Sequence, residues 1–200
     1  VESQRRAALA IAEGRFAGQI VPVVQKTRKG EVTFDTDEHV KPNTTLESLA
    51  KMRPAFRPAG SVTAGNASGI NDGAAFLVLA DAAVAARAGQ RPLARLVSYA
   101  LAGVPNEIMG EGPIPATRLA LSRAGLRLDQ IDGIEANEAF AAQALAVNRA
   151  LDLDPAKTNP NGGAIALGHP VGCSGAFIAT KAIHELQRSG GRYALVTMCI

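Results

Sequence analysis

The sequence is poor in aromatic residues and in cysteine. Of its 200 residues, 4% are aromatic, none is tryptophan, and only Cys173 and Cys199 are cysteines. Two cysteines make no disulfide framework and no metal cluster, so we expect reduced thiols, a cytoplasmic location and no bound metal. No apolar stretch approaches the roughly 20 residues needed to cross a bilayer, so no membrane partner is expected.

Charge of one sign is also scarce. The formal net charge is +3, and the positive residues are scattered instead of forming a basic run with interleaved aromatics. This pattern argues against a nucleic-acid partner. A small ligand that bears phosphates matches the same charges equally well. Hydrophobic residues at 47% and charged residues at 20% indicate a folded globular chain.

The order of apolar and polar segments predicts an α/β fold. Small apolar side chains with few aromatics suit helices packed closely on a sheet. Strands alternating with helices are typical of layered α/β proteins. We predict strands over 19–25, 32–34, 74–79, 93–101, 133–136 and 193–198, and helices over 1–13, 45–51, 81–88, 116–124, 138–151 and 175–188.

Two of these helices have distinctive faces. Between residues 138 and 147 eight of ten residues are apolar. This predicts a helix that is covered on all sides, between two sheets. In helix 175–188 the polar residues, Lys181 and His184 among them, form one stripe at helical spacing, which predicts that His184 faces solvent.

A run of small residues over 61–73 contains most of the glycine, serine and asparagine in this part of the chain. Such a run costs backbone entropy on folding, because glycine loses more conformational freedom than other residues. It usually marks a place where the backbone passes close to something else.

His169 lies in a glycine-rich loop over 159–172, just before a predicted helix. Pro170 restricts the backbone and the glycines permit tight turns, so the imidazole can be held in one orientation. A catalytic histidine and a histidine that only pins the loop both fit. No Gly-Lys-Ser/Thr sequence closes the loop, so it is not a phosphate-binding P-loop.

Asn137 lies where a predicted strand meets a predicted helix. A neutral amide there can orient a water or a ligand inside a pocket. The alternative role is a helix N-cap, which asparagine often supplies. The two roles compete for the same side-chain oxygen.

Cys199 follows the predicted strand 193–198, where a rigid scaffold can present a thiol. A buried cysteine is more often inert. With a histidine nearby it becomes a candidate for acyl transfer or proton abstraction. Cys173, in the glycine-rich loop, is a weaker candidate, since a small thiol there can simply fill a small space.

Together these motifs resemble the thiolase family, closest to bacterial β-ketothiolases of the acetoacetyl-CoA and 3-ketoacyl-CoA type. The resemblance covers essentially the whole chain. It rests on the order and spacing of Asn137-Glu138-Ala139-Phe140, the stretch 162–175, Cys199, the stretches 61–69 and 109–116, and residues 49–56.

The resemblance implies a layered αβαβα fold and acyl transfer between CoA thioesters, without metal or redox cofactor. Cys199 matches the acid/base cysteine. His169 matches the histidine that activates the nucleophile and stabilises an enolate oxygen, and Asn137 matches the residue that positions a water in that oxyanion hole. The positions that match the CoA channel are Ser68, Ala64, Met109, Ala139, Phe140 and, at the nucleotide end, Lys41. Lys41 stands where relatives often carry arginine, so bidentate phosphate contact is lost.

The resemblance also implies that the family's acyl-accepting cysteine lies outside this sequence. We therefore expect an incomplete, C-terminal half of the fold without turnover of its own. Its expected parts are the end of the CoA-binding loop domain (1–70), the last strand–helix unit of the N-terminal domain (71–91) and a truncated C-terminal domain (92–200).

The resemblance implies a homodimer or homotetramer for the whole enzyme. Two alternatives remain: a thiolase-like protein that binds CoA or lipid without chemistry, and a ketosynthase, which shares the fold but lacks the Asn-Glu-Ala-Phe sequence and usually accepts carrier-bound substrates. The sequence leaves acyl chain length and metabolic direction open.

Overall fold

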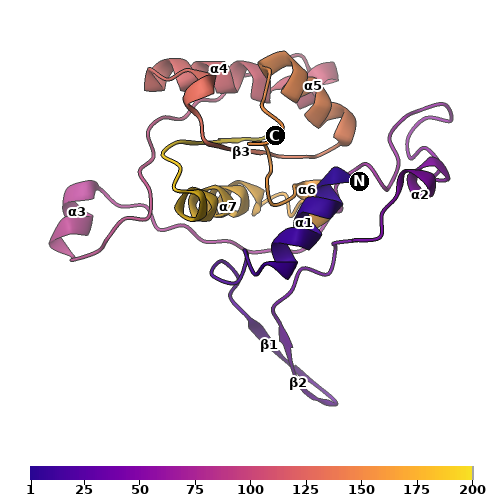
Figure 1. Ribbon diagram of the computed structural model, residues 1–200, viewed down its shortest axis with the longest axis horizontal. Helices are drawn as coiled ribbons and strands as arrows, with labels where there is room; N and C mark the ends of the chain where they lie inside the picture. Colours follow the sequence, from indigo (N-terminus) through magenta and orange to yellow (C-terminus); the bar gives the residue numbers. More distant parts are fainter. Residues whose placement is uncertain (200) are drawn as a thin grey trace.

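The structure, a computed structural model, describes residues 1–199. Its centre is a two-stranded parallel sheet of β3 (Gly133–Ala136) and β4 (Ala194–Thr197). Helices α4 (Pro113–Ala124) and α5 (Ala141–Leu151) lie on one side of this sheet, and α7 (Ser174–Ser189) lies on the other (Figure 1). This layering of helices on both faces of a parallel sheet confirms the expected α/β class.

The main hydrophobic core lies between the sheet and the α4–α5 layer. Alternate residues of a strand face opposite sides, so Ile134 and Ala136 of β3 point into this core and Glu135 points toward α7. The core consists of Ile131, Ile134, Ala136, Val147, Leu151, Leu153 and Leu195. A second cluster packs α1 (Glu2–Ala12) against α6 (Ala164–Leu167), with Ala7, Ala10, Phe16, Ala166 and Leu167 buried.

The free edge of β3 is covered by the segment that follows α5. The Ile134 N–H donates to the Lys157 carbonyl at 2.9 Å, and the Asn159 N–H donates to the Ile134 carbonyl at 2.8 Å. The Asn159 side chain then continues the ladder: its Nδ2 donates to the Ala136 carbonyl at 2.7 Å, and its Oδ1 accepts from the Ala136 N–H at 2.9 Å. An asparagine side chain thus replaces a strand at this edge.

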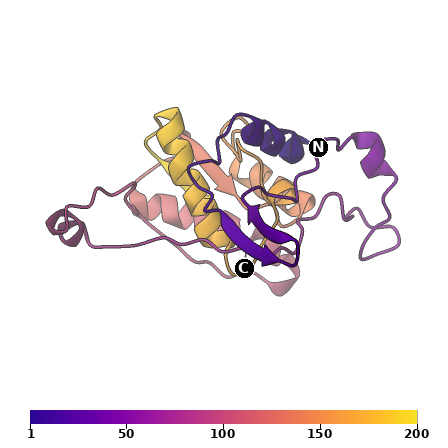
Figure 2. The same ribbon diagram turned by 90° about the horizontal axis from the view of Figure 1, so that it is seen from below.

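Three smaller elements lie at the periphery. The antiparallel hairpin of β1 (Val23–Thr27) and β2 (Gly30–Phe34) projects away from the body (Figures 1 and 2). Helix α2 (Leu46–Ala50) begins at the capping residue Thr45, and α3 (Ala82–Arg87) begins at Asp81, whose carboxylate accepts from two backbone N–H groups. Two short 3₁₀ turns, η1 (Asn106–Glu111) and η2 (Leu128–Gln130), flank α4.

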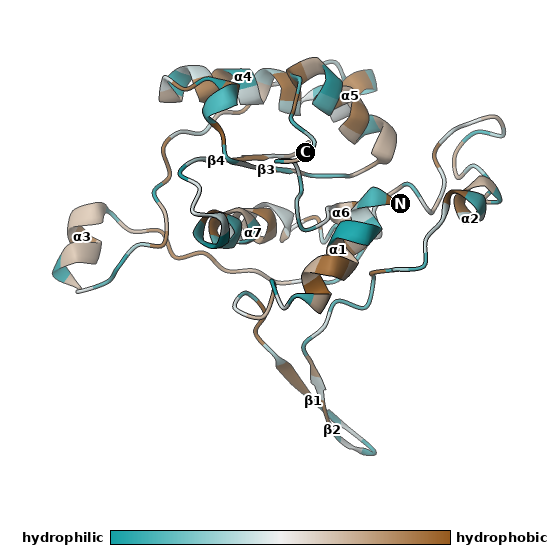
Figure 3. Cartoon of the chain, in the orientation of Figure 1, coloured by the Kyte–Doolittle hydropathy of each residue, from teal (hydrophilic) through white to brown (hydrophobic). Residues whose placement is uncertain are grey.

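The predicted strands over 74–79 and 93–101 are wrong. Both segments are extended chain on either side of α3, and within residues 1–199 no strand pairs with them. Phe76 is 89% exposed and Val78 is 98% exposed. Figure 3 shows apolar stretches along this part of the ribbon. Their β-prone side chains suit a sheet, but a strand also needs a hydrogen-bonding neighbour.

The predicted helix over 138–151 begins late and is not covered on all sides. Helix α5 starts at Ala141, with Phe140 as the preceding residue. Only Ala144, Val147 and Leu151 on one face are buried, while Leu145 on the opposite face is 52% exposed. In the described part of the chain α5 packs against the sheet, α4 and η1, and no second sheet covers its outer face, so the expected position between two sheets is wrong here.

The polar stripe predicted for α7 is also partly wrong. Lys181 is 1% exposed instead of solvated. His184 is half-buried and lies beside Gly18. The strand that follows α7 agrees with prediction, since β4 occupies most of the predicted strand 193–198. Ile200, the last residue of the expected unit 92–200, lies outside the described residues.

Across residues 1–199, no helix combines the length and the apolar character that a bilayer crossing demands. The same residues contain no group of three or more histidine, cysteine or acidic side chains placed to hold a metal ion.

Candidate active site

Asn137 and His169 come together in the structure. Asn137 directly follows β3, and its backbone N–H donates to the Thr197 carbonyl of β4 at 2.9 Å. Its side-chain Nδ2 lies 3.2 Å from His169 Nε2. Asn137 is 5% exposed, so the amide is held inside the protein. Because α5 begins at Ala141, Asn137 does not cap it, and that alternative is wrong.

The His169 ring is fixed at both nitrogens. Its Nδ1 lies 2.6 Å from Ser174 Oγ, and that hydroxyl donates to the Pro170 carbonyl at 3.0 Å. Since the Ser174 proton is committed to the carbonyl, Ser174 Oγ accepts from Nδ1–H. His169 Nε2 then carries the lone pair and accepts from the Asn137 amide. This chain of donors sets one tautomer of the neutral ring.

Burial lowers the pKa of His169, since it disfavours the charged imidazolium. A neutral ring with a lone pair on Nε2 can accept a proton from a nearby thiol. The backbone of His169 is held as well, because its N–H donates to the Gly69 carbonyl at 3.0 Å. The small-residue run is thereby joined to the histidine loop.

Glycines make that join possible. Gly168 has a φ of +92°, and a Cβ at Gly168 or at Gly69 would collide with the side chain of Asn71. The run over 61–73 therefore passes close to its own chain. The prediction that a ligand arm also passes over it stays a prediction.

Cys199 lies at the same edge of the sheet as Asn137. Asn137 directly follows β3 and Cys199 comes two residues after the end of β4, and the carboxyl ends of these paired parallel strands meet at one edge. Cys199 is 9% exposed. Burial raises the pKa of its thiol, with a backbone hydrogen bond opposing the shift. The group is thus a protonated thiol near neutral pH, suited to donating a proton.

Cys173 occupies a different place. It precedes α7 and lines a pocket of about 330 Å³ together with residues 71–75 and 170–172. Burial raises the pKa of its thiol too. No hydrogen bond joins its thiol to another described residue, and the predicted space-filling role stays a prediction.

Three of the predicted CoA-channel residues lie together. The Ser68 N–H and the Ser68 hydroxyl both donate to the Ala139 carbonyl at 3.0 Å. Phe140 pairs with Ala67 in an isolated antiparallel bridge and meets Phe56 edge-to-face, with ring centroids 6.1 Å apart. The Asn-Glu-Ala-Phe segment is therefore an extended wall that abuts the small-residue run.

The other three predicted channel residues stand apart from this wall. Ala64 and Lys41 are exposed, and the backbone N–H of Lys41 donates to Gln4 Oε1 of α1 at 2.6 Å. Met109, in η1, is 48% exposed. The carbonyl of Gly110, which follows Met109, accepts from Gln143 Nε2 of α5 at 3.1 Å, and this contact places η1 beside α5.

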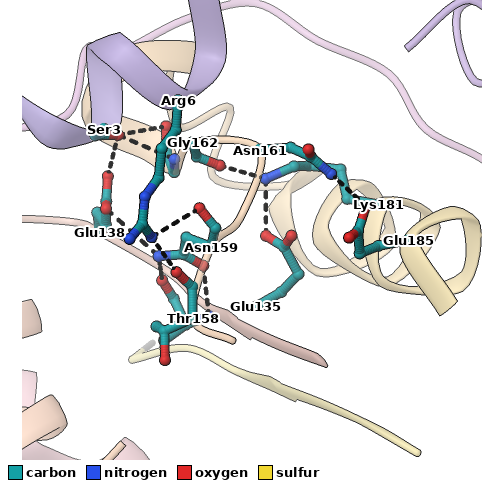
Figure 4. Close-up of polar contacts among 12 residues, drawn as sticks. Ser3, Arg6, Glu135, Glu138, Thr158, Asn159, Asn161, Gly162, Lys181 and Glu185 are labelled. Carbon is teal, nitrogen blue, oxygen red and sulfur yellow. Dashed lines mark hydrogen bonds and ion pairs between the residues drawn. The ribbon is translucent and has the colours of Figure 1, made fainter. Parts of the chain in front are cut away.

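Sequence reasoning missed a buried ion pair behind the site (Figure 4). Lys181 Nζ lies 2.8 Å from Glu135 Oε2 and donates to the Gly162 carbonyl at 2.6 Å. Burial raises the pKa of Glu135, and the Lys181 charge opposes this. The sequence carried no signal for this pair: the row of α7 that holds Lys181 also holds Ser174, Ile178 and Glu185, and only the structure shows that the row is buried.

Glu138 was assigned no function at the sequence level and ties three segments together (Figure 4). Its Oε2 accepts from Ser3 Oγ at 2.7 Å and from the Ile165 N–H at 3.2 Å, and a Cβ on Gly163 would collide with its carboxylate. Beside it, Arg6 donates to the carbonyls of Pro155 and Asn159 at 2.9 and 3.3 Å. The Glu138 carboxylate thus docks α1 and α6 on the site wall.

Comparison with known proteins matches this architecture. Residues 1–83 match the thiolase N-terminal domain model and residues 90–200 match the thiolase C-terminal domain model. The chain is 62% identical to the β-ketothiolase BktB of Cupriavidus necator and 54% identical to an acetyl-CoA acetyltransferase of Shinella zoogloeoides. It is covered completely in both cases and spans 51% of each relative, about half their length.

Solved structures agree. The acetyl-CoA acetyltransferase of Bacillus anthracis superposes with a TM-score of 0.96 at 50% identity, over 99% of this chain and 50% of that one. Human mitochondrial 3-ketoacyl-CoA thiolase in complex with CoA superposes with a TM-score of 0.90 at 45% identity, over 100% of this chain and 49% of that one. By sequence and by fold, the chain belongs to the thiolase family.

Proposed function

We propose that this chain supplies the acid/base half of a thiolase active site. The parent reaction is acyl transfer between CoA thioesters: Claisen condensation of acetyl-CoA, or thiolysis of a 3-ketoacyl-CoA through an acyl-cysteine. The observation that carries the proposal is the Asn137–His169 pair at 3.2 Å, beside the sheet edge that holds Cys199. The enzymatic activities of the relatives support it.

Each group has a role that its environment suits. The neutral His169 accepts a proton at Nε2 from the acyl-accepting thiol, which the family places in the other half of the fold. Once protonated, the ring donates to the thioester oxygen as an enolate forms, and a water held by the Asn137 amide completes that oxyanion hole. In thiolysis the Cys199 thiol, whose pKa burial raises, gives its proton to the carbanion that leaves and becomes a thiolate; in condensation that thiolate removes the methyl proton and returns to the thiol.

For CoA we propose a channel along the wall formed by Ala139 and Phe140 and the adjoining Ser68. We propose that Ala64 and Met109, both exposed, contact the pantetheine arm and that exposed Lys41 contacts a phosphate. The neighbour solved with CoA supports CoA as the ligand. Thiol and imidazole groups carry both acyl and proton transfer, so we propose no separate cofactor.

We also propose a homodimer or homotetramer and a cytoplasmic location for the parent enzyme. The oligomer is carried over from the resemblance to the thiolase family. Both cysteines are free thiols, which suits a reducing compartment.

A chimaera tests the function. The portion of the Cupriavidus necator β-ketothiolase that aligns with this chain is replaced by this chain, and thiolysis of acetoacetyl-CoA is measured. We expect turnover from the chimaera and none from the 200-residue chain alone. In the chimaera, His169→Gln and Cys199→Ser should each lower kcat by about 10²–10⁴-fold, as for loss of a general acid or base.

Matched controls separate chemistry from folding. His184→Gln on α7 should leave the rate unchanged, because that ring is remote from the Asn137 pair. A folded chimaera without turnover, or full turnover after His169→Gln, would contradict the proposal. Calorimetry with CoA addresses the alternative: micromolar binding by the chain alone, with an inactive chimaera, favours a binding protein. Preference for carrier-protein thioesters over CoA thioesters favours a ketosynthase.

A further inference from the structure

The buried bridge of Lys181, Glu135 and the Gly162 carbonyl has no assigned role in the chemistry. Lys181 Nζ reaches Glu135 Oε2 at 2.8 Å and the Gly162 carbonyl at 2.6 Å, and the two side chains are 1% and 3% exposed. Figure 4 shows the ammonium between the strand and the loop. The bridge thus joins β3, α7 and the segment that leads into α6.

Stability alone does not account for this bridge. A buried ion pair loses the hydration of both charges, and replacing such a pair with apolar residues is often neutral or stabilising. Here one carboxylate oxygen, Glu135 Oε1, has no hydrogen-bond partner among the described residues. Burial raises the pKa of the Glu135 carboxyl, in line with that cost. An arrangement that gains little stability but links three elements suits a positional role.

Each of the three linked elements carries one member of the histidine site. Asn137 follows Glu135 by two positions in extended chain, so the two side chains lie on the same face of the sheet. Gly162 opens the turn into α6, which ends directly before Gly168 and His169. Lys181 lies two helical turns after Ser174, which holds His169 Nδ1, on the same buried row of α7.

We propose that Lys181 is a positioning residue for the Asn137–His169 pair. By holding Glu135 and the Gly162 carbonyl on one ammonium, it sets the separation between the strand that carries Asn137 and the loop that carries His169. The inference concerns the geometry of the pair and rests on the proposed function only for its catalytic meaning.

Nuclear magnetic resonance on the full 200-residue chain tests this. The readouts are the ¹⁵N shifts of the His169 ring, which report its tautomer, and the nuclear Overhauser effect between the Asn137 side-chain amide and the ring. The His169 signals are assigned by their disappearance in His169→Gln. In the wild type we expect the Nδ1–H tautomer and a visible cross-peak.

The variants separate position from stability. Lys181→Met keeps a side chain of similar length but removes the hydrogen-bond donor and the charge. It should abolish the cross-peak and move the His169 ring shifts toward a mixture of tautomers. Glu135→Gln keeps an oxygen that can accept from the Lys181 ammonium, so the Asn137–His169 cross-peak should persist even if the urea midpoint of unfolding decreases. Arg127→Met removes an exposed ion pair away from the bridge, between side chains that are 72% and 67% exposed, and should leave both readouts unchanged.

If Lys181→Met alone fails to fold, the double variant Glu135→Met, Lys181→Met takes its place, because an apolar pair can fill the site without a buried charge. It too should fold and lose the cross-peak. A wild-type cross-peak and tautomer in folded Lys181→Met, or in the folded double variant, overturns the proposal, as does their loss in Arg127→Met. These readouts need no substrate, so a chimaera without thiolysis would refute the proposed function and leave this result standing.

Discussion

The pairing of Asn159 with the edge of β3 makes a graded prediction for stability. The Asn159 side chain accepts from the Ala136 N–H at 2.9 Å and donates to the Ala136 carbonyl at 2.7 Å, in a buried position. Its own backbone has a φ of +47°, a conformation that non-glycine residues rarely adopt. Substitution therefore tests two separable contributions, the paired hydrogen bonds and the backbone conformation.

Asn159→Ala leaves two buried backbone groups of Ala136 unpaired. Each such group costs about 1–3 kcal/mol, so the loss is about 2–6 kcal/mol, and a left-handed alanine adds about 1 kcal/mol. Asn159→Gly removes the same hydrogen bonds but adopts positive φ freely, so we expect it to be about 1 kcal/mol more stable than the alanine variant. Both changes are large beside a typical domain stability of about 5–15 kcal/mol.

Asp152 supplies the matched control. It ends α5 with a φ of 54° and its side chain is exposed, so Asp152→Ala introduces the backbone strain without unpairing a strand. Urea unfolding followed by circular dichroism measures the free energies, and hydrogen exchange at the Ala136 amide reports the lost pairing. If Asn159→Ala costs no more than Asp152→Ala and leaves that amide protected, the strand-like role of the asparagine is refuted.

Other substitutions test the core, the tautomer and the surface charge. Leu151→Ala should lower the free energy of unfolding by about 2–5 kcal/mol, whereas Leu145→Ala on the exposed face of the same helix should change it by less than about 0.5 kcal/mol, both in urea titrations. Ser174→Ala removes the acceptor of the site imidazole's Nδ1–H, so ¹⁵N shifts should move toward the Nε2–H tautomer; unchanged shifts would contradict the assigned donor chain. Hydrogen bonding from Arg5 lowers the pKa of Glu2 from 4.5 to about 2, so Glu2 stabilises the fold above pH 4.5 and this contribution is lost as the pH falls toward 2. Glu2→Gln should therefore lower the urea midpoint at pH 7 by an amount worth about 0.2–1 kcal/mol, since the pair is exposed, and the difference should vanish near pH 2.

Much of the fold followed from local patterns. The predicted strands 133–136 and 193–198 correspond to β3 and β4, because each segment is short, β-prone and bounded by turn signals, and a neighbour within the described chain completes each ladder. The segments 74–79 and 93–101 have the same character but no such neighbour. Side-chain patterns report what a segment prefers, whereas hydrogen bonding to a second strand decides whether a ladder forms.

The site was predicted in part. The nearness of Asn137 and His169, and the shared edge with Cys199, agree with what the motifs implied, because those motifs lie at strand ends and in one glycine loop. The Lys181 bridge was missed because lysine on an amphipathic helix is usually solvated. Only the fold shows that the Lys181 side chain points inward, toward Glu135 on strand β3.

Glu138 changes what the Asn-Glu-Ala-Phe sequence means as a signature. Its carboxylate accepts hydrogen bonds from α1 and from the α6 turn. The Ala139 carbonyl accepts from Ser68, and the Phe140 ring packs edge-to-face on Phe56. The side chains of Glu138 and Phe140 therefore also serve the assembly of the chain, Ala139 adds a backbone carbonyl, and only Asn137 faces the imidazole. A relative that had lost its reactive histidine or thiol would still need Glu138 and Phe140 for the same packing. Retention of the signature thus marks inheritance of an architecture, and catalytic competence must be judged at other positions.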